Sequence, residues 1–164
     1  MTRPLALLAL VGFALAACGP SPSSVDGPRV YKISDRDAAD IQYRTLDSIN
    51  SLRTAAGLTT VQLNPQLNAA AATHSRDMSL QNRPWDFGSD GSSPMTRVAR
   101  TGYPGTFLGE VIAETYESEI ETLGAWMDDP RSRPVIMDPE ARDLGFSWYQ
   151  ENNGKIWWTL VTGG

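Results

Sequence analysis

Hydrophobic residues recur every three or four positions in the first part of the chain, which is the spacing of one face of an α-helix. This spacing predicts a first helix that begins near Ser34, where Ser34 and Asp37 resemble a capping box, and that ends before Gly57. Its inner face is expected to carry Ala38, Ile41, Thr45, Ile49, Leu52 and Ala56.

Three further helices follow from caps and periodicity. Asn64 as N-cap and Pro65 in the first turn begin a second helix. Ser93 can cap a short helix over 94–100, and a third long helix is expected over 118–128. The expected inner faces are Leu67, Ala70, Ala71, His74 and Met78 in the second helix, and Ile120, Leu123 and Met127 in the third.

The C-terminal part alternates hydrophobic and polar residues, which is typical of strands. Strands are predicted over 144–150 and 155–161, joined by a tight turn at Asn153-Gly154, with a short extended segment over 109–113. Alternation places Trp157 and Trp158 on opposite faces of their strand. Helices followed by a terminal antiparallel hairpin predict an α+β layered domain.

The N-terminal stretch "MTRPLALLALVGFALAAC" has one positive charge and then an apolar run, the layout of a secretory signal at residues 1–17. The run is too short for a comfortable spanning helix, which needs about 20 apolar residues. "LAAC" resembles the lipobox of bacterial lipoproteins, which implies lipidation of Cys18, the only cysteine; the alternative is an ordinary cleaved signal with an incidental cysteine. Residues 18–33 then form a lipidated tether, and 34–164 the folded domain.

The net charge of the chain limits which kinds of partner it can bind. The net charge of −5 argues against a nucleic-acid partner and against electrostatic docking on an anionic membrane. A membrane contact is therefore expected through the lipid on Cys18, and two or more acyl chains would make it stable.

Two ionisable residues sit in apolar surroundings. Glu110, in "FLGEVIAETY", is costly to bury without a partner. It is either a ligand-facing acid or a structural carboxylate that accepts backbone N–H groups. His74, the only histidine, is expected to be a packed, hydrogen-bonded core residue; if it reaches a cleft instead, it is the one base that titrates near neutral pH.

Several ordered motifs resemble the CAP superfamily, the cysteine-rich secretory, antigen and pathogenesis-related proteins. They are "GSDGSSPMTRV", "GEVIA", "AWMDDP" and "LGFSWYQ" with "KIWWTLVTG", and the resemblance covers roughly residues 38–164. It implies a three-layer α-β-α sandwich with an open cleft. The family cleft typically holds two His and one or two acids that can bind a divalent metal.

Each cleft position of the family can be matched to a residue of this sequence. The first His position falls on Asp86, the first acid on Glu110, a second acid on Asp129, and the second His on Ser132. Zinc prefers nitrogen and sulfur ligands, and these four side chains offer only oxygen, which suits calcium or magnesium. We therefore expect no bound metal and no cofactor.

The roles of two of these four residues can also be explained without a ligand or a reaction. Asp86 is either a ligand-facing acid, or general base, paired with Glu110, or a turn residue that bonds its own backbone. Ser132 has no identified base to activate it as a nucleophile.

Three functions follow. The first is an envelope-anchored CAP-domain lipoprotein, expected at the outer membrane by its resemblance to Gram-negative lipoproteins, that binds a lipid, cell-wall or protein ligand without catalysis. The alternative is an envelope hydrolase, metal-assisted or carboxylate-based, that uses Asp86 and Glu110. A third is a structural lipoprotein that makes protein contacts through an exposed aromatic patch around Trp157.

Overall fold

The computed structural model of the protein describes residues 30–115 and 117–164. The predicted signal at 1–17, lipidation at Cys18 and most of the tether lie outside the described residues, so these stay predictions.

Four strands form the middle layer of the fold. They are β1 (Gln62–Leu63), β2 (Phe107–Thr115), β3 (Asp143–Gln150) and β4 (Ile156–Gly163). Their order in the sheet is β1-β3-β4-β2. β1 runs parallel to β3, whereas β4 is antiparallel to both of its neighbours.

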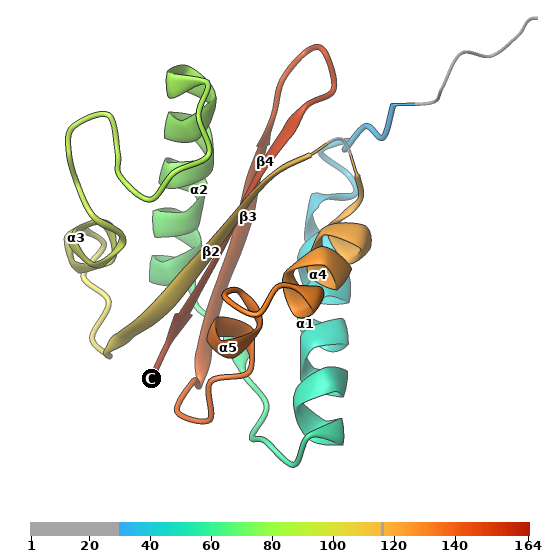
Figure 1. The fold of residues 1–164 in the computed structure, drawn as a ribbon, viewed down its shortest axis with the longest axis vertical. Coiled ribbons are helices and arrows are strands. Elements are labelled where there is room, and N and C mark those ends of the chain that lie inside the picture. The colour runs from blue at the N-terminus through green and yellow to red at the C-terminus, as the bar shows by residue number, and fades with distance from the viewer. Residues whose placement is uncertain (1–29, 116) are drawn as a thin grey trace, which may run out of the picture.

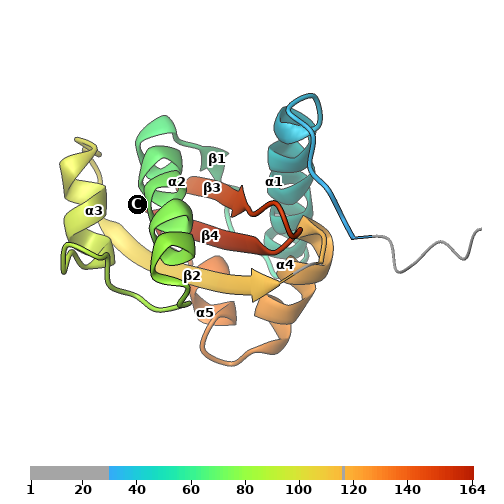
Figure 2. The ribbon, with the colours of Figure 1, turned by 90° about the horizontal axis from the view of Figure 1, so that it is seen from above.

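Helices cover both faces of this sheet. They are α1 (Ala38–Ala55), α2 (Pro65–Gln81), α3 (Pro94–Arg100), α4 (Glu119–Asp128) and α5 (Arg133–Ile136). In Figure 1, α2 and α3 lie on one side of the sheet and α1, α4 and α5 on the other. Figure 2 shows the same elements from above, with the three longer strands side by side. The predicted α+β three-layer sandwich with a C-terminal hairpin is confirmed.

The predicted caps explain where α2 and α3 begin. The Asn64 side chain accepts hydrogen bonds from the backbone N–H groups of Gln66 and Leu67, and Ser93 caps α3 by accepting from Thr96. α2 then packs against β3 at Gly145, where a Cβ atom would collide with the main chain of Leu67. Only glycine allows this close approach.

The start and the inner face of the first helix differ from the prediction. α1 begins at Ala38, and the Ser34 hydroxyl donates to the Asp37 carboxylate instead of capping the helix. Leu52 is 38% exposed, whereas Arg53 is fully buried. The Arg53 guanidinium donates to the main-chain carbonyls of Thr59, Ile136, Asp138 and Ala141. Its long side chain reaches loop carbonyls that the periodic pattern does not reveal.

Other predicted details also change. Ile120, expected on the inner face of the third long helix, is 44% exposed, and Trp126 is buried there instead. The Trp126 indole donates to the Ile112 carbonyl at 3.1 Å. β2 is longer than the expected segment 109–113, and β1 was not predicted, because a two-residue strand has no readable periodicity.

The alternation of Trp157 and Trp158 is confirmed, but both side chains are fully buried. Trp158 joins the core on the α1, α4 and α5 side. Trp157 lies on the other face, with its indole bonded to Glu151 at 2.7 Å and the Lys155 ammonium 3.9 Å above its ring. The exposed aromatic patch expected around Trp157 is therefore wrong, because helices cover both faces of the hairpin.

Candidate functional site

Glu110 lies in the middle of β2, opposite Val161 of β4. Its side chain is 4% exposed. The neighbouring Gly109 faces Val135 of α5, and Val111 belongs to the core on that same side. Because side chains alternate along a strand, Glu110 points to the opposite face, beneath α2 and α3.

Arg97 of α3 is the direct partner of Glu110. Its Nη2 atom donates to Glu110 Oε1 at 2.7 Å. Its Nη1 atom donates to the carbonyls of Asp86 at 3.0 Å and Ser92 at 2.9 Å. The side chain is only 4% exposed, so it ties α3, the preceding loop and the sheet together in a largely buried position. Neither hypothesis for Glu110 included Arg97; the bond comes from a side chain, not from the backbone N–H groups considered above.

His74 of α2 completes the cluster, which we call the Glu110 cluster: His74, Arg97 and Glu110. The ring is fully buried, and its Nε2 atom lies 3.0 Å from the Trp85 carbonyl and 3.6 Å from Glu110 Oε1. A carbonyl can only accept, so the neutral ring carries its hydrogen on Nε2. The expectation of a packed, hydrogen-bonded His74 is confirmed, and the ring is also a neighbour of Glu110.

The surroundings shift both ionisable groups toward their neutral forms. Burial raises the pKa of Glu110 to about 7, against the opposing charge and hydrogen bond of Arg97 and with a smaller contribution from Asp86. Burial and the charge of Arg97 lower the pKa of His74 to about 4, against the Trp85 hydrogen bond and the charge of Asp77. His74 is therefore neutral at pH 7.

Three polar atoms of the cluster are buried and have no hydrogen-bond partner among the described residues. They are His74 Nδ1, Arg97 Nε and Glu110 Oε2. Buried polar groups in folded proteins are nearly always hydrogen-bonded, so three unpaired polar atoms in one cluster are unusual.

Asp86 lies close to this cluster but at the surface. Its side chain is exposed and makes no hydrogen bond within the described part of the chain, whereas its carbonyl is held by Arg97. Its charge contributes to the raised pKa of Glu110. The structure thus brings Asp86 near Glu110, with Arg97 joined to both residues.

Asp129 and Ser132 form a separate pair between α4 and α5. The Ser132 hydroxyl donates to Asp129 Oδ2 at 2.6 Å, and the Arg131 N–H donates to Oδ1 at 3.3 Å. These bonds hold the pKa of Asp129 below its usual range, with the Ser132 bond the largest cause. Within residues 30–115 and 117–164, no group of three or more His, Cys, Asp and Glu side chains is placed to hold a metal ion.

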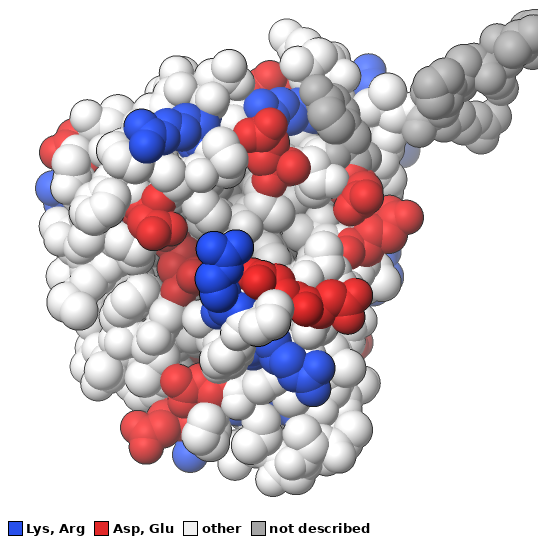
Figure 3. All heavy atoms as spheres, viewed as in Figure 1, with Lys and Arg blue, Asp and Glu red and all other residues white. Residues whose placement is uncertain are grey.

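A groove between α2 and α3 lies beside the Glu110 cluster and has a volume of about 520 Å³. Arg97 belongs to both, and the groove also contains Arg76 and Leu80 of α2 and Arg100 of α3. Its acids are already engaged: Asp77 accepts two bonds from Ser89, and Asp90 pairs with Arg100. Figure 3 shows acidic and basic side chains interspersed over the visible face.

The model of the CAP family, described as the cysteine-rich secretory protein family, matches residues 46–162. The chain belongs to this family. Because Cys18 is the only cysteine, the CAP domain between these bounds contains none, and its architecture is held without disulfides.

Solved structures support the same fold. An outer surface protein from Borrelia burgdorferi superposes with a TM-score of 0.69 at 15% identity, covering 82% of this chain and 98% of that chain. An extracellular protein containing an SCP domain from Bacillus anthracis gives a TM-score of 0.69 at 18% identity, covering 80% of this chain and 44% of that chain.

A curated relative, the uncharacterised protein YkwD of Bacillus subtilis (strain 168), is 22% identical over 137 residues. The match covers 84% of this chain and 52% of the relative, so this chain spans about half the length of that protein. Among the helices of the described CAP domain, none combines the length and apolar composition that a membrane crossing requires.

The chemistry open to the Glu110 cluster is limited. A carboxyl group with a pKa near 7 is suited to general acid–base catalysis. However, Glu110 is buried and bonded to Arg97, and in the described structure no serine hydroxyl lies within hydrogen-bond distance of His74. The cluster therefore lacks the paired nucleophile and base that covalent catalysis needs.

Proposed function

We propose that this chain is an envelope-anchored CAP-domain lipoprotein that binds a ligand or partner without catalysing a reaction. The observation that carries the proposal is the buried Arg97–Glu110 pair. The acid at the family's cleft position is joined to a guanidinium at 2.7 Å and is shielded from solvent, so it is unsuited to hold a metal or to exchange protons with a substrate.

The groove between α2 and α3 is the candidate binding site. Its volume of about 520 Å³ is within the usual range of small-molecule sites, roughly 300–1,000 Å³. Leu80 offers apolar surface, and Arg76 adds a positive charge. Anchoring through Cys18 would hold this groove near the membrane, where lipid, cell-wall and protein ligands are available.

The substitution Glu110→Gln can distinguish a binding protein from an enzyme that uses Glu110. Glutamine keeps an oxygen that can accept from Arg97 but cannot transfer a proton. Full-length wild-type and variant protein would be incubated with an envelope extract, and both the products and the co-purifying molecules identified by mass spectrometry. We expect the same bound species with both proteins and no product specific to the wild type. Leu80→Asp, in the groove, should reduce the bound species.

The alternative is a carboxylate-based hydrolase, and the raised pKa of Glu110 beside the Asp86 charge is the observation that favours it. This function predicts a product that wild-type protein forms and that Glu110→Gln and Asp86→Asn both abolish. Such a result would replace the binding proposal.

The anchor is tested separately. Cys18→Ala should abolish labelling by a fatty-acid analogue and release the protein from the membrane fraction. Retained labelling would contradict lipidation at Cys18.

A further inference from the structure

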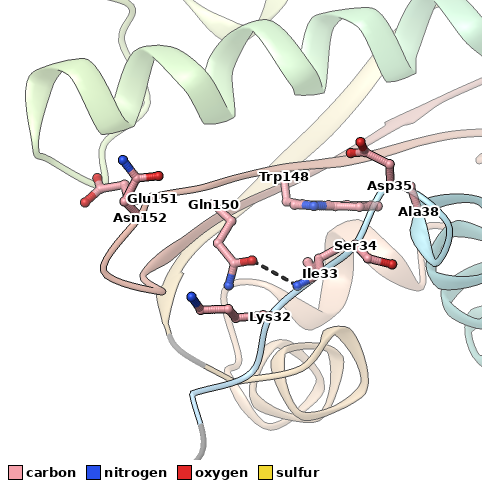
Figure 4. A pocket seen from close by; sticks show the side chains of 9 residues that line it. All are labelled: Lys32, Ile33, Ser34, Asp35, Ala38, Trp148, Gln150, Glu151 and Asn152. Atoms are coloured by element: carbon pink, nitrogen blue, oxygen red, sulfur yellow. Dashed lines mark hydrogen bonds between the residues drawn. The ribbon is translucent and has the colours of Figure 1, made fainter.

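A second hollow, which we call the Trp148 pocket, lies on the domain where the chain emerges from the N-terminal region. It has a volume of about 360 Å³. Residues 32–35 and Ala38 form one side, and the end of β3 with the following turn forms the other. Figure 4 shows an elongated site, with Trp148 and Asp35 toward one end, Asn152 toward the other, and Gln150 between them. It shares no residue with the α2–α3 groove.

One side chain fixes the wall of this pocket. Gln150 Oε1 accepts from the Ile33 N–H at 2.9 Å (Figure 4), and Gln150 Nε2 donates to the carbonyls of Tyr31 at 2.7 Å and Gly154 at 3.0 Å. The Tyr31 hydroxyl also donates to Glu119 of α4 at 2.8 Å. The segment is therefore held in place before any ligand binds, which lowers the entropic cost of binding.

The aromatic surface comes from Trp148. Its ring packs against Phe146 and Trp158, with centroids 6.0 Å and 5.7 Å away and tilted planes. These contacts hold the indole rigidly, yet Trp148 is only partly buried and lines the pocket. Its indole N–H makes no hydrogen bond within the described residues and is not among the buried polar atoms, so it is available as a donor.

Some polar side chains around the Trp148 ring already make hydrogen bonds, and others are free to bind a ligand. Glu151 already accepts from Ser79 and Trp157 at Oε1 and from Asn153 at Oε2, so both of its oxygens are engaged. Lys32, Asp35 and Asn152 are exposed, and no hydrogen bond or ion pair of their side chains occurs among the described residues. The available groups are thus one cation, one anion and one carboxamide.

We propose that the Trp148 pocket binds sugar rings of a short oligosaccharide. The apolar face of a pyranose can stack on the indole, while its hydroxyls bond to Asn152, Asp35 and Lys32. A strongly anionic ligand is disfavoured, because Asp35 and Glu151 are both anions and Lys32 is the one cation that lines the pocket. An acyl chain is disfavoured because most of the lining is polar. The elongated shape suits more than one ring.

The test uses the full-length protein in detergent and isothermal titration with two neutral trisaccharides, tri-N-acetylchitotriose and cellotriose. At least one should bind, and the preferred one defines the sugar class. Trp148→Phe keeps an aromatic ring in the core and should weaken binding about 3- to 10-fold through lost stacking area. Asn152→Ala, at an exposed site where folding is not at risk, should weaken it about 3- to 10-fold through a lost hydrogen bond.

Arg36→Ala is the matched control, because it removes a neighbouring exposed charge that does not line the pocket; its affinity should stay within about twofold of wild type. Failure of both trisaccharides to bind at millimolar concentration would overturn the proposal. So would binding that Asn152→Ala and Trp148→Phe leave unchanged. Binding of the zwitterionic dipeptide Lys-Asp in place of either sugar would also overturn it.

Discussion

The two faces of the sheet are built from different chemistry. The face beneath α1, α4 and α5 carries an aromatic core, in which Trp158 stacks on Phe146 with centroids 5.6 Å apart. The face beneath α2 and α3 has a smaller apolar cluster and buries His74, Arg97 and Glu110. The first face gains stability from apolar area, whereas the second depends on polar groups that must satisfy one another.

A buried charged residue, Arg53, also occurs on the face covered by α1, α4 and α5, but its partners are of a different kind. Arg53 is fully buried there, but its partners are main-chain carbonyls and not a carboxylate. Its role is to hold loops, and burial lowers its pKa without bringing a second titrating group close enough to pair. On the same side, the buried Glu119 pairs with Arg44, whose side chain is 52% exposed, whereas on the α2–α3 face both members of the Arg97–Glu110 pair are buried.

The largest effect is expected on the aromatic face. Trp158→Ala should lower the free energy of unfolding by about 3–5 kcal/mol, because it removes a fully buried ring and leaves a cavity. Urea denaturation followed by circular dichroism measures this. A loss below about 1 kcal/mol would mean that this face does not carry the stability assigned to it.

Arg97→Ala tests the polar face. It leaves Glu110 and two carbonyls without their donor, and breaking a buried pair typically costs about 3–5 kcal/mol. The cost should be greater at pH 8 than at pH 6, because a protonated Glu110 no longer needs a cation. The double variant Arg97→Met with Glu110→Leu should recover much of the loss. A single variant as stable as wild type at pH 8 would contradict the pairing.

Glu110→Gln should change how stability depends on pH. A folded-state pKa of about 7, above the ordinary value of 4.5, means that Glu110 stabilises the fold at low pH and that this contribution is lost as pH rises from 4.5 to 7. Relative to wild type, the variant should gain up to about 3 kcal/mol between pH 4.5 and pH 8. Parallel stability curves for the two proteins would refute the raised pKa.

His74 should act in the opposite direction. Its folded-state pKa of about 4, below the ordinary 6.5, means that its contribution is present above pH 6.5 and is lost as pH falls toward 4. His74→Gln, which keeps a donor for the Trp85 carbonyl, should gain up to about 3 kcal/mol on going from pH 7 to pH 4. The two titrations oppose each other between pH 4.5 and 6.5, so each single variant should show a steeper dependence there than wild type.

The smallest effect is expected from the exposed pair Asp90–Arg100. Both side chains are more than half exposed, so Asp90→Asn should leave the free energy of unfolding close to that of wild type, with a smaller difference still in high salt. A change as large as that of Arg97→Ala would show that burial does not distinguish the two pairs.

The sequence by itself determined the longer helices and strands and their order, but not the short β1 and α5. The caps at Asn64 and Ser93 and the alternation over β3 and β4 are local signals, because they depend on residues within one turn or one strand. Together they predicted the layered α+β fold, and the ordered set of motifs over residues 38–164 indicated the CAP superfamily. They also singled out both Glu110 and His74, but as separate residues.

Only the tertiary structure decided which side chains contact Glu110 and the other buried polar residues. Arg97 is 13 positions from Glu110, and His74 comes from another helix, so their contact depends on how α2 and α3 pack on β2. Asp129 and Ser132 pair with each other because one short turn joins them. Burial of Trp157 and Arg53 likewise depends on distant segments. Hydrophobic periodicity identifies the side of an element that faces inward, but the charge a buried group meets is set by which elements pack together.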